Sequence, residues 1–331
     1  MKKKKFKQKQ VSWKSKQQSK KSKQARDLFL RFITLVIFLG FLVLVFNIYL
    51  NFKKNKWDGN HQINFVVLEN EVMVFSYHPE DDILNILNFS SDTFIPTASE
   101  YGEYPIGNIY KLGELEEING GILLSQSLQE LLAVPIDAYI VQTNLKNDKD
   151  SVFKQGGLFS LLWQMISGNI DTNLSNWDVI RLIFKLNSLK TGQIKQVDFS
   201  DSSLLVSEVL PDGSNISKPD FLRIDKVSVE LFSDQSILEE ALTVSVLNGT
   251  GKKNLAKNIA RMMRNLGAEL INAGDADNKQ SHSTILVKSK DLQKSYTLKK
   301  LKQTLRIEKF ENSDFEEDLV IILGEDFTSL P

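Results

Sequence analysis

Hydrophobic positions along the chain follow two spacings, one typical of strands and one typical of helices. Alternating or continuous apolar runs bounded by turn residues predict strands at 63–69, 71–77, 83–89 and 136–143. Apolar residues three or four positions apart predict helices at 122–132, 158–166 and 177–189. Because strands and helices are interspersed, we predict an α/β domain with a mixed sheet and covering helices over residues 51–232.

A second, more regular pattern follows a polar, Ser/Asp-rich stretch at 200–240, in which 211–219 is a turn-containing loop. This pattern predicts strand 242–249, helix 253–266, strands 268–274 and 283–289, helix 292–305 and strand 318–324. The βαββαβ order is typical of a small split-βαβ sandwich with one sheet and two helices. We therefore predict a separate C-terminal domain at 242–328.

Residues 32–50 form an uncharged stretch of 19 residues, FITLVIFLGFLVLVFNIYL. As a helix it would cover roughly 28 Å, close to the thickness of a bilayer core. Helices of soluble proteins are rarely apolar on all sides. A signal peptide has a shorter apolar region that ends at a small-residue cleavage site, and 51–60 contains none. We predict an uncleaved, single-pass transmembrane helix.

Charge is segregated across this span. The whole chain has 41 basic and 41 acidic residues, but 1–31 hold 13 of the basic residues and only Asp27 as an acid. The other 300 residues therefore carry a net charge of −12. The positive-inside rule places the N-terminus in the cytoplasm and 51–331 outside the membrane. We expect 1–31 to be a disordered tail attracted to anionic membrane lipid rather than to nucleic acid.

Composition removes several classes of site. The chain has no cysteine, which excludes disulfides, Cys-ligated zinc, iron–sulfur clusters and thiol nucleophiles. Its three histidines make a His-rich metal cage improbable, and no metal site is predicted. His78 and the acids after it fall in a predicted turn, where we expect solvated side chains rather than an acid–base cluster. We expect Trp177 to lie in the core.

The most distinctive local string is a glycine-rich turn between a strand and a helix, formed by Asn248, Gly249, Thr250 and Gly251. Such turns can present backbone N–H groups to anions, which makes these four residues a candidate ligand-binding site. The spacing fits neither a P-loop nor a dinucleotide fingerprint. A tight turn without a ligand is the alternative reading.

These residues also carry a family resemblance. The strand Val244-Ser-Val-Leu-Asn-Gly-Thr-Gly251, the helix after it and the late strand Asp318-Leu-Val-Ile-Ile-Leu-Gly-Glu-Asp-Phe327 resemble the C-terminal domain of LytR-type cell-envelope proteins. With less similarity, Asn88–Pro96, Glu130–Val141 and Asp171–Arg181 resemble parts of the LytR-CpsA-Psr catalytic domain. In active members this domain is expected to bind a polyprenyl-pyrophosphate-linked glycopolymer through arginines. It holds Mg²⁺ with acids and transfers the polymer to peptidoglycan or another wall acceptor.

The chain departs from the family pattern at the arginines. Where the family has a P-R-D-T-like segment, this chain has Ser91 followed by Asp92 and Thr93, and its 145–165 stretch contains no arginine. A pyrophosphate is best held by forked, permanently charged guanidinium groups. We therefore expect a degenerate domain without enzymatic activity and without a cofactor.

The sequence thus predicts a bacterial cell-envelope protein anchored in the membrane. Its expected role is non-catalytic binding or scaffolding in cell-wall glycopolymer attachment or envelope maintenance, with a wall polymer or envelope proteins as partners. The alternative is a divergent glycopolymer–peptidoglycan ligase, a phosphotransferase in which Asp92 is catalytic and Mg²⁺ is bound. A transcriptional regulator is disfavoured, because no helix-turn-helix pattern precedes the span.

Overall fold

A computed structural model describes residues 32–35, 38–40, 55–142, 170–199, 204–209, 215–312 and 315–327. The chain divides into two compact units, Met1–Lys54 and Asn55–Pro331. In the first unit, 32–35 and 38–40 are helical, and the rest of the predicted span and the basic tail lie outside the described residues. Within the described ranges, no helix has the length and apolar character needed to cross a membrane.

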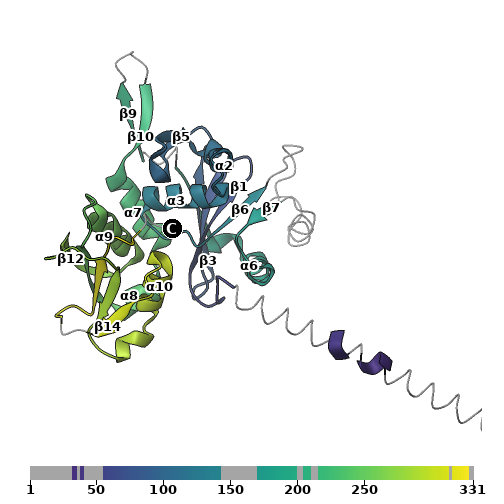
Figure 1. Ribbon diagram of the computed structural model, residues 1–331. Helices are drawn as coiled ribbons and strands as arrows, with labels where there is room; N and C mark the ends of the chain where they lie inside the picture. The colour runs from purple at the N-terminus through teal and green to yellow at the C-terminus, as the bar shows by residue number, and fades with distance from the viewer. Residues whose placement is uncertain are drawn as a thin grey trace, which may run out of the picture. The chain divides into compact units, whose positions relative to one another are not determined.

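The second unit begins with a six-stranded mixed sheet (Figure 1). Its strands are β1 (Ile63–Leu68), β2 (Val72–His78), β3 (Ile83–Phe89), β6 (Ala138–Gln142), β7 (Ile170–Thr172) and β8 (Ile194–Asp198), in the spatial order β7-β6-β1-β2-β3-β8. The three strands predicted at 63–69, 71–77 and 83–89 are confirmed, and they form a meander in which β1, β2 and β3 pair antiparallel with their chain neighbours. Two of the other strands add in parallel, β6 beside β1 and β8 beside β3.

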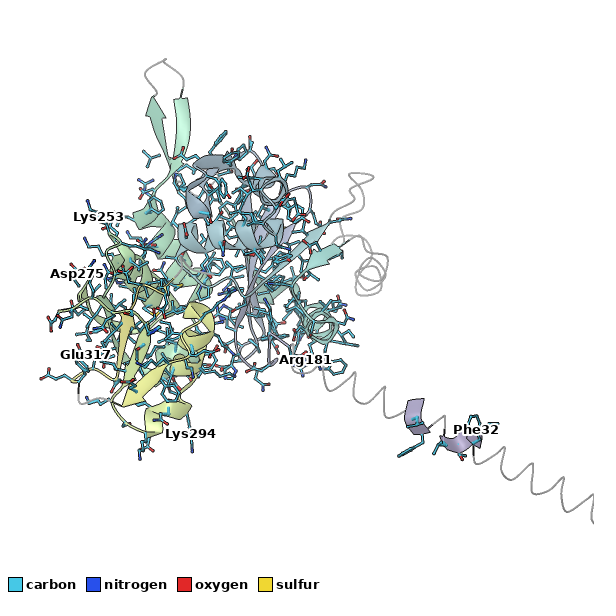
Figure 2. All side chains as sticks on the ribbon, viewed as in Figure 1. Phe32, Arg181, Lys253, Asp275, Lys294 and Glu317 are labelled. Carbon is cyan, nitrogen blue, oxygen red and sulfur yellow. The ribbon has the colours of Figure 1, made fainter. Side chains whose placement is uncertain are left out.

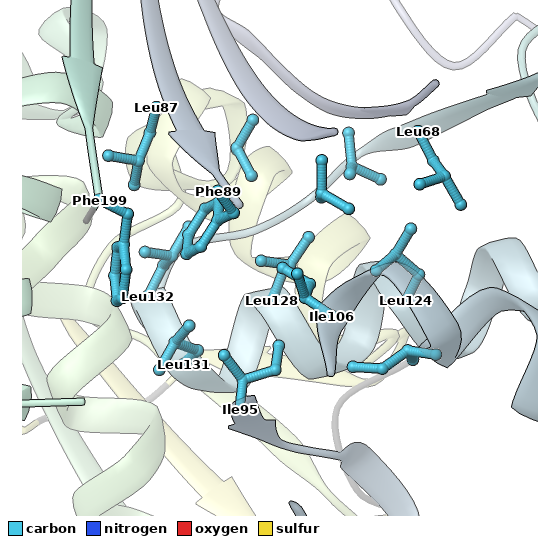
Figure 3. Packing of buried hydrophobic residues seen from close by; sticks show 14 of the residues in the cluster. Leu68, Leu87, Phe89, Ile95, Ile106, Leu124, Leu128, Leu131, Leu132 and Phe199 are labelled. Atoms are coloured by element: carbon cyan, nitrogen blue, oxygen red, sulfur yellow. The ribbon is translucent and has the colours of Figure 1, made fainter. Parts of the chain in front are cut away.

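Both faces of this sheet are covered, which explains why all six residues of β1 are buried. Successive side chains of a strand point to opposite faces. Val66 packs on one face with β2, β3 and the helices α2 (Ile106–Leu115), α3 (Gly120–Leu132) and α7 (Phe221–Phe232). Figure 3 shows the part of this core between the strands and α3. Phe65 packs on the other face with α6 (Asn176–Ser188).

Local signals fix the ends of the predicted helices. The Asn119 side chain accepts a hydrogen bond from the N–H of Ile122 at the start of α3. Ser175 and Asp178 form a capping box at the start of α6. The helix predicted at 158–166 lies outside the described residues. Trp177, expected in the core, is 41% exposed, because it begins α6 on the side away from the sheet, with the Arg181 guanidinium over its ring.

The polar stretch at 200–240 contains more structure than its composition indicated. It holds the hairpin β9 (Leu205–Val209) and β10 (Asn215–Pro219), then α7 and the short helix α8 (Gln235–Glu240). Asp220 caps α7, and Ile224, Leu231 and Phe232 bury one face of that helix. The small hairpin β4 (Phe94–Pro96) and β5 (Glu103–Pro105) was likewise not predicted.

The C-terminal domain is a five-stranded sheet with two helices packed in one apolar cluster. Its elements are β11 (Thr243–Asn248), α9 (Leu255–Leu266), β12 (Glu269–Asp275), β13 (Thr284–Val287), α10 (Tyr296–Leu305), β14 (Phe310–Asn312) and β15 (Leu319–Leu323). All six predicted elements are present, and the short strand β14 is added. The predicted split-βαβ arrangement is wrong: β11 lies directly between β12 and β15 and is parallel to both. The order of elements along the chain does not determine which strands pair.

Candidate functional site

The Asp92 segment follows β3 at the edge of the sheet where that strand ends. Asp92 is exposed, and the hydroxyl of Ser90 donates a hydrogen bond to its carboxylate. The N–H of Thr93 binds the carbonyl of Ser90 at 3.0 Å, and the N–H of Ile106 binds the carbonyl of Thr93 at 2.8 Å. These bonds hold Asp92 in a tight turn that joins β3 to the start of α2.

Ser91, at the position of the family's arginine, is half-buried and is bound to two neighbouring segments. Its hydroxyl donates to the backbone carbonyl of Asn70 at 2.6 Å, and its own carbonyl accepts from the N–H of Gly107 at 3.0 Å. A Cβ atom on Gly107 would lie 2.8 Å from the Cβ of Ser91, so the two segments touch at backbone distance. Ser91 therefore serves as a small connector between the β1–β2 turn and α2.

Three of the arginines in the unit Asn55–Pro331 form structural contacts. Arg181 donates to the carbonyl of Trp57 at 3.1 Å. Arg223 pairs with Asp220 at 3.1 Å on its own helix, and Arg261 pairs with Asp225 at 2.6 Å. None of the ion pairs in the described part of the chain involves Asp92, and 145–165 lies outside that part.

The turn of Asn248, Gly249, Thr250 and Gly251 is closed by its own hydrogen bonds. The Asn248 side chain accepts from the Thr250 N–H at 3.1 Å and donates to the carbonyl of Lys252 at 2.9 Å. The N–H of Gly249 binds the carbonyl of Leu323 at 2.8 Å, and the N–H of Lys252 binds the hydroxyl of Thr250 at 3.0 Å. Lys253 and Asp275, both labelled in Figure 2, belong to the segments beside this turn. Two backbone N–H groups of the turn, and that of Lys252 just after it, are thus already used within the protein.

Metal ligation has little support in the described residues. No group of three or more His, Asp or Glu side chains that could hold a metal ion occurs there. Asp92 has no second acid as a hydrogen-bonded or ion-paired neighbour in the described ranges. These residues do not form an oxygen-rich Mg²⁺ site, and no step through a metal can be derived from them.

His78 differs from its predicted role. It is the last residue of β2 and is half-buried, and its Nε2 lies 3.0 Å from the Ser76 hydroxyl and 3.2 Å from the Leu231 carbonyl. Burial lowers the pKa of His78. The side chain therefore connects the sheet to the end of α7, whereas the acids after it do form the turn.

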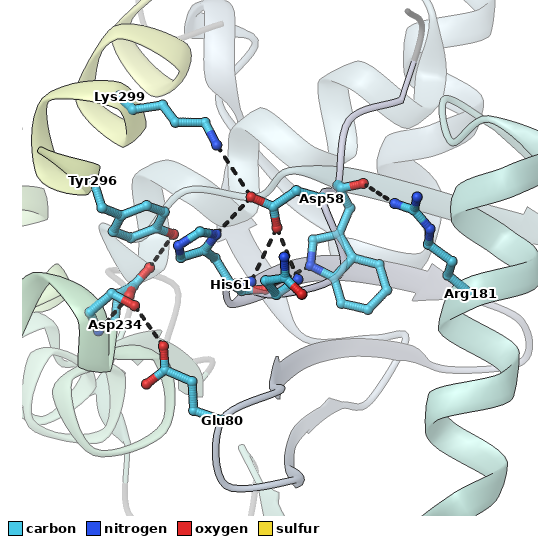
Figure 4. A network of polar contacts seen from close by, with 10 residues as sticks. Asp58, His61, Glu80, Arg181, Asp234, Tyr296 and Lys299 are labelled. Atoms are coloured by element: carbon cyan, nitrogen blue, oxygen red, sulfur yellow. Dashed lines mark hydrogen bonds and ion pairs between the residues drawn. The ribbon is translucent and has the colours of Figure 1, made fainter. Parts of the chain in front are cut away.

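We call residues 55–232 the N-terminal lobe and residues 242–327 the C-terminal lobe. A polar network joins the two lobes (Figure 4). The His61 ring stacks on the Tyr296 ring with centroids 4.1 Å apart. The Tyr296 hydroxyl donates to Asp234 at 2.8 Å, and Asp58 accepts from His61 at 2.7 Å and from Lys299 at 3.2 Å. Burial raises the pKa of Asp234. These contacts attach the start of α10 to the segment before β1.

A buried ion pair lies beside this network. The Lys300 side chain is only 7% exposed, and its ammonium contacts Asp137 at 2.8 Å. The other oxygen of Asp137 accepts from the Asn64 N–H at 2.9 Å. Next to it is a cavity of about 450 Å³ between α3, the start of β6 and the end of α10. Its lining comes from both lobes: Asn55, Lys56, Ile122, Ser125, Gln129, Pro135, Ile136, Asp137, Tyr139, Asn173, Gln303, Thr304 and Arg306.

No sequence pattern indicates this cavity. Its polar residues lie far apart along the chain, from Asn55 to Arg306, and no motif spacing connects them. The local pattern of α3 and α10 predicts only that each helix has a buried face. A cavity of this kind becomes visible only when the packing of the two lobes is known.

Comparisons with known proteins support part of the predicted resemblance. The family model described as LytR cell envelope-related transcriptional attenuator matches residues 241–327. Solved structures that resemble the chain include TagT of Bacillus subtilis, with 15% identity and a TM-score of 0.37 over 53% of this chain and 91% of that chain. A second is YwtF (TagT) with bound octaprenyl pyrophosphate lipid, with 16% identity and a TM-score of 0.37 over 53% and 91%.

A third similar structure is Lin1025 of Listeria innocua, with 11% identity and a TM-score of 0.35 over 51% of this chain and 95% of that chain. No curated protein matches the chain in sequence. Likenesses at these scores carry no argument about function. The match over residues 241–327 confirms the predicted resemblance of this region to the C-terminal domain of LytR-type cell-envelope proteins.

Proposed function

We propose that this chain is a cell-envelope protein of the LytR-CpsA-Psr type that binds or scaffolds an envelope component without transferring it. The observation that carries the proposal is Ser91. It stands where the family has an arginine, and its hydroxyl is already bound to the carbonyl of Asn70. A buried or partly buried diphosphate needs paired, hydrogen-bonded charge. Around Asp92 the described residues provide no guanidinium for that purpose.

Membrane anchoring is part of the same proposal. It is supported by the uncharged stretch of 19 residues at 32–50 and by the 13 cations that precede it. Protease added to intact cells should digest the unit Asn55–Pro331 and leave the basic tail intact. Protection of that unit, with digestion only after the cells are opened, would contradict the orientation.

Binding and transfer can be measured separately on the compact unit Asn55–Pro331. Similar solved structures contain octaprenyl pyrophosphate lipid or wall teichoic acid intermediates, so these compounds serve as probes. We expect the purified unit to retain one of these probes or a peptidoglycan fragment while forming no transfer product with Mg²⁺ present. Losing a single charge-stabilising arginine typically slows phosphoryl transfer by about 10³–10⁵, and several are missing here.

The ligase alternative makes the opposite forecast. It requires a transfer product that disappears in Asp92→Ala. The product should persist in Asp277→Ala, which changes an exposed aspartate of the C-terminal lobe and serves as the matched control. Such a result would replace the non-catalytic proposal. If none of the probes bound and no transfer occurred, the binding role would be refuted as well.

A further inference from the structure

Asp92 and the cavity between the lobes lie at opposite ends of the strands of the six-stranded sheet. Because β1 and β3 each pair antiparallel with β2, they run in the same direction, and β6 runs parallel to β1. Asp92 follows the end of β3, whereas the cavity is lined by Pro135, Ile136 and Asp137, which precede β6. The two regions are therefore separate sites, and the cavity can hold a ligand whether or not the proposed function is correct.

Positively charged side chains outnumber acidic ones in the lining of this cavity. Lys56 and Arg306 line it from the two lobes, and neither side chain forms an ion pair within the ranges that the structure describes. Of the two acids nearby, Asp137 is already paired with Lys300, and Asp178 accepts from the backbone N–H of Lys56 at 3.0 Å. Partial burial lowers the pKa of Lys56, and the charge of Arg306 lowers it further, against the raising effect of the two acids.

The remaining polar lining consists of amides and hydroxyls. Gln129 is 4% exposed, and its amide oxygen accepts from the Ile136 N–H at 3.0 Å. Its amide nitrogen has no hydrogen-bond partner among the described residues. A buried donor of this kind is normally satisfied by water or by a ligand. Asn173, Gln303 and Thr304 add further groups that both donate and accept, and Ile122 and Ile136 supply apolar surface.

These features together specify the chemistry of an occupant. Two cations favour an anion, and amides that donate and accept suit neighbouring hydroxyl groups. A volume of about 450 Å³ lies within the range of small-molecule pockets. We propose that this cavity binds a small sugar phosphate, with Lys56 and Arg306 on the phosphate and the amides of Gln129 and Asn173 on the sugar hydroxyls.

Calorimetric titration of the full chain tests the proposal with three probes: glucose 1-phosphate, glucose and inorganic phosphate. We expect saturable binding of glucose 1-phosphate, with each of the other two at least about tenfold weaker. Arg306→Gln and Lys56→Gln should each weaken glucose 1-phosphate binding by about tenfold or more, because each removes a charged hydrogen-bond donor.

Matched substitutions outside the cavity complete the design. Arg264→Gln and Lys253→Gln alter exposed side chains of the C-terminal lobe and should leave binding unchanged. Absence of saturation up to roughly 10 mM probe, equal binding in Arg306→Gln and wild type, or equal losses in the control variants would overturn the site. Equal affinity for inorganic phosphate would overturn the assignment of a sugar, and equal affinity for glucose would overturn the role of the cations. Circular dichroism of each variant excludes loss of folding as the cause of weaker binding.

Discussion

Arg261 connects the two lobes through one guanidinium group. Replacing it should destabilise the unit that contains both lobes but not the isolated C-terminal lobe. It lies on α9 of the C-terminal lobe. Its Nε donates to Asp225 at 2.7 Å, and its Nη1 and Nη2 donate to the carbonyls of Glu130 and Leu131 at 3.0 and 2.8 Å. Both carbonyls belong to the last turn of α3, where a cation also interacts favourably with the helix dipole.

The expected loss can be worked out from these contacts. A hydrogen bond to a charged group contributes about 1.5–3 kcal/mol when it is well shielded. Here the side chains of Arg261 and Asp225 are 21% and 26% exposed, so water can replace part of each interaction. We therefore expect Arg261→Met to reduce the free energy of unfolding of Asn55–Pro331 by about 2–4 kcal/mol. Arg261→Lys should lose about half as much, because an ammonium cannot reproduce the fork.

Urea unfolding followed by circular dichroism measures these differences. Arg264→Met, which changes an exposed residue three positions later on the same helix, should cost less than about 0.5 kcal/mol. The decisive comparison is a fragment of residues 240–331, which we expect to fold independently. Arg261→Met should leave its stability unchanged, because Asp225 and the α3 carbonyls are absent. An equal loss in the fragment and in the longer unit would refute the role assigned to Arg261.

Three further outcomes are expected. Ile259→Ala should lower the stability of the 240–331 fragment by about 2–5 kcal/mol, because Ile259 is fully buried; an unchanged melting temperature would contradict its place in the core. Burial depresses the pKa of His78 below 6.5, so the contribution of neutral His78 to stability is complete above that pH and is lost as the pH falls. Between pH 5 and 8, the free energy of unfolding should therefore depend less steeply on pH in His78→Gln than in the wild type. Gly120→Ala should destabilise by about 1–3 kcal/mol despite alanine's higher helix propensity, because the new Cβ would lie 2.1 Å from the Tyr110 carbonyl oxygen. Gly192→Ala, with no atom within 4 Å of the new Cβ, is its control in thermal denaturation.

Sequence patterns predicted those elements whose burial is decided by local spacing. The largely apolar stretch at 63–69 contains β1, which is buried on both faces, and the regular apolar spacing of 253–266 contains α9, with Ile259 and Leu266 buried. The helix α7 carried a readable signal too: Asp220 as a cap, then apolar residues at 224, 227 and 231. Polar residues around it diluted that signal, so no helix was predicted there.

Features that depend on long-range packing were not predictable in the same way. The placement of β11 between β12 and β15 requires a pairing with residues more than 70 positions away. The replacement of the family's arginine by Ser91 was visible in the sequence, but the close approach of Ser91 to Gly107 was not. Lys56, Gln129 and Arg306 meet only because α10 packs beside the start of β6.

The pairing of β8 with β3 has a consequence for how the protein is made. Leu84 pairs with Ile194, which lies 110 residues later in the chain. At a synthesis rate of about 5–20 residues per second, the edge of β3 stays without its partner for roughly 5–20 s after it emerges from the ribosome. An open strand edge next to a hydrophobic meander can pair with other chains during that interval. The growing chain is therefore prone to aggregation between the synthesis of β3 and that of β8. A molecular chaperone that protects the chain would act in that interval.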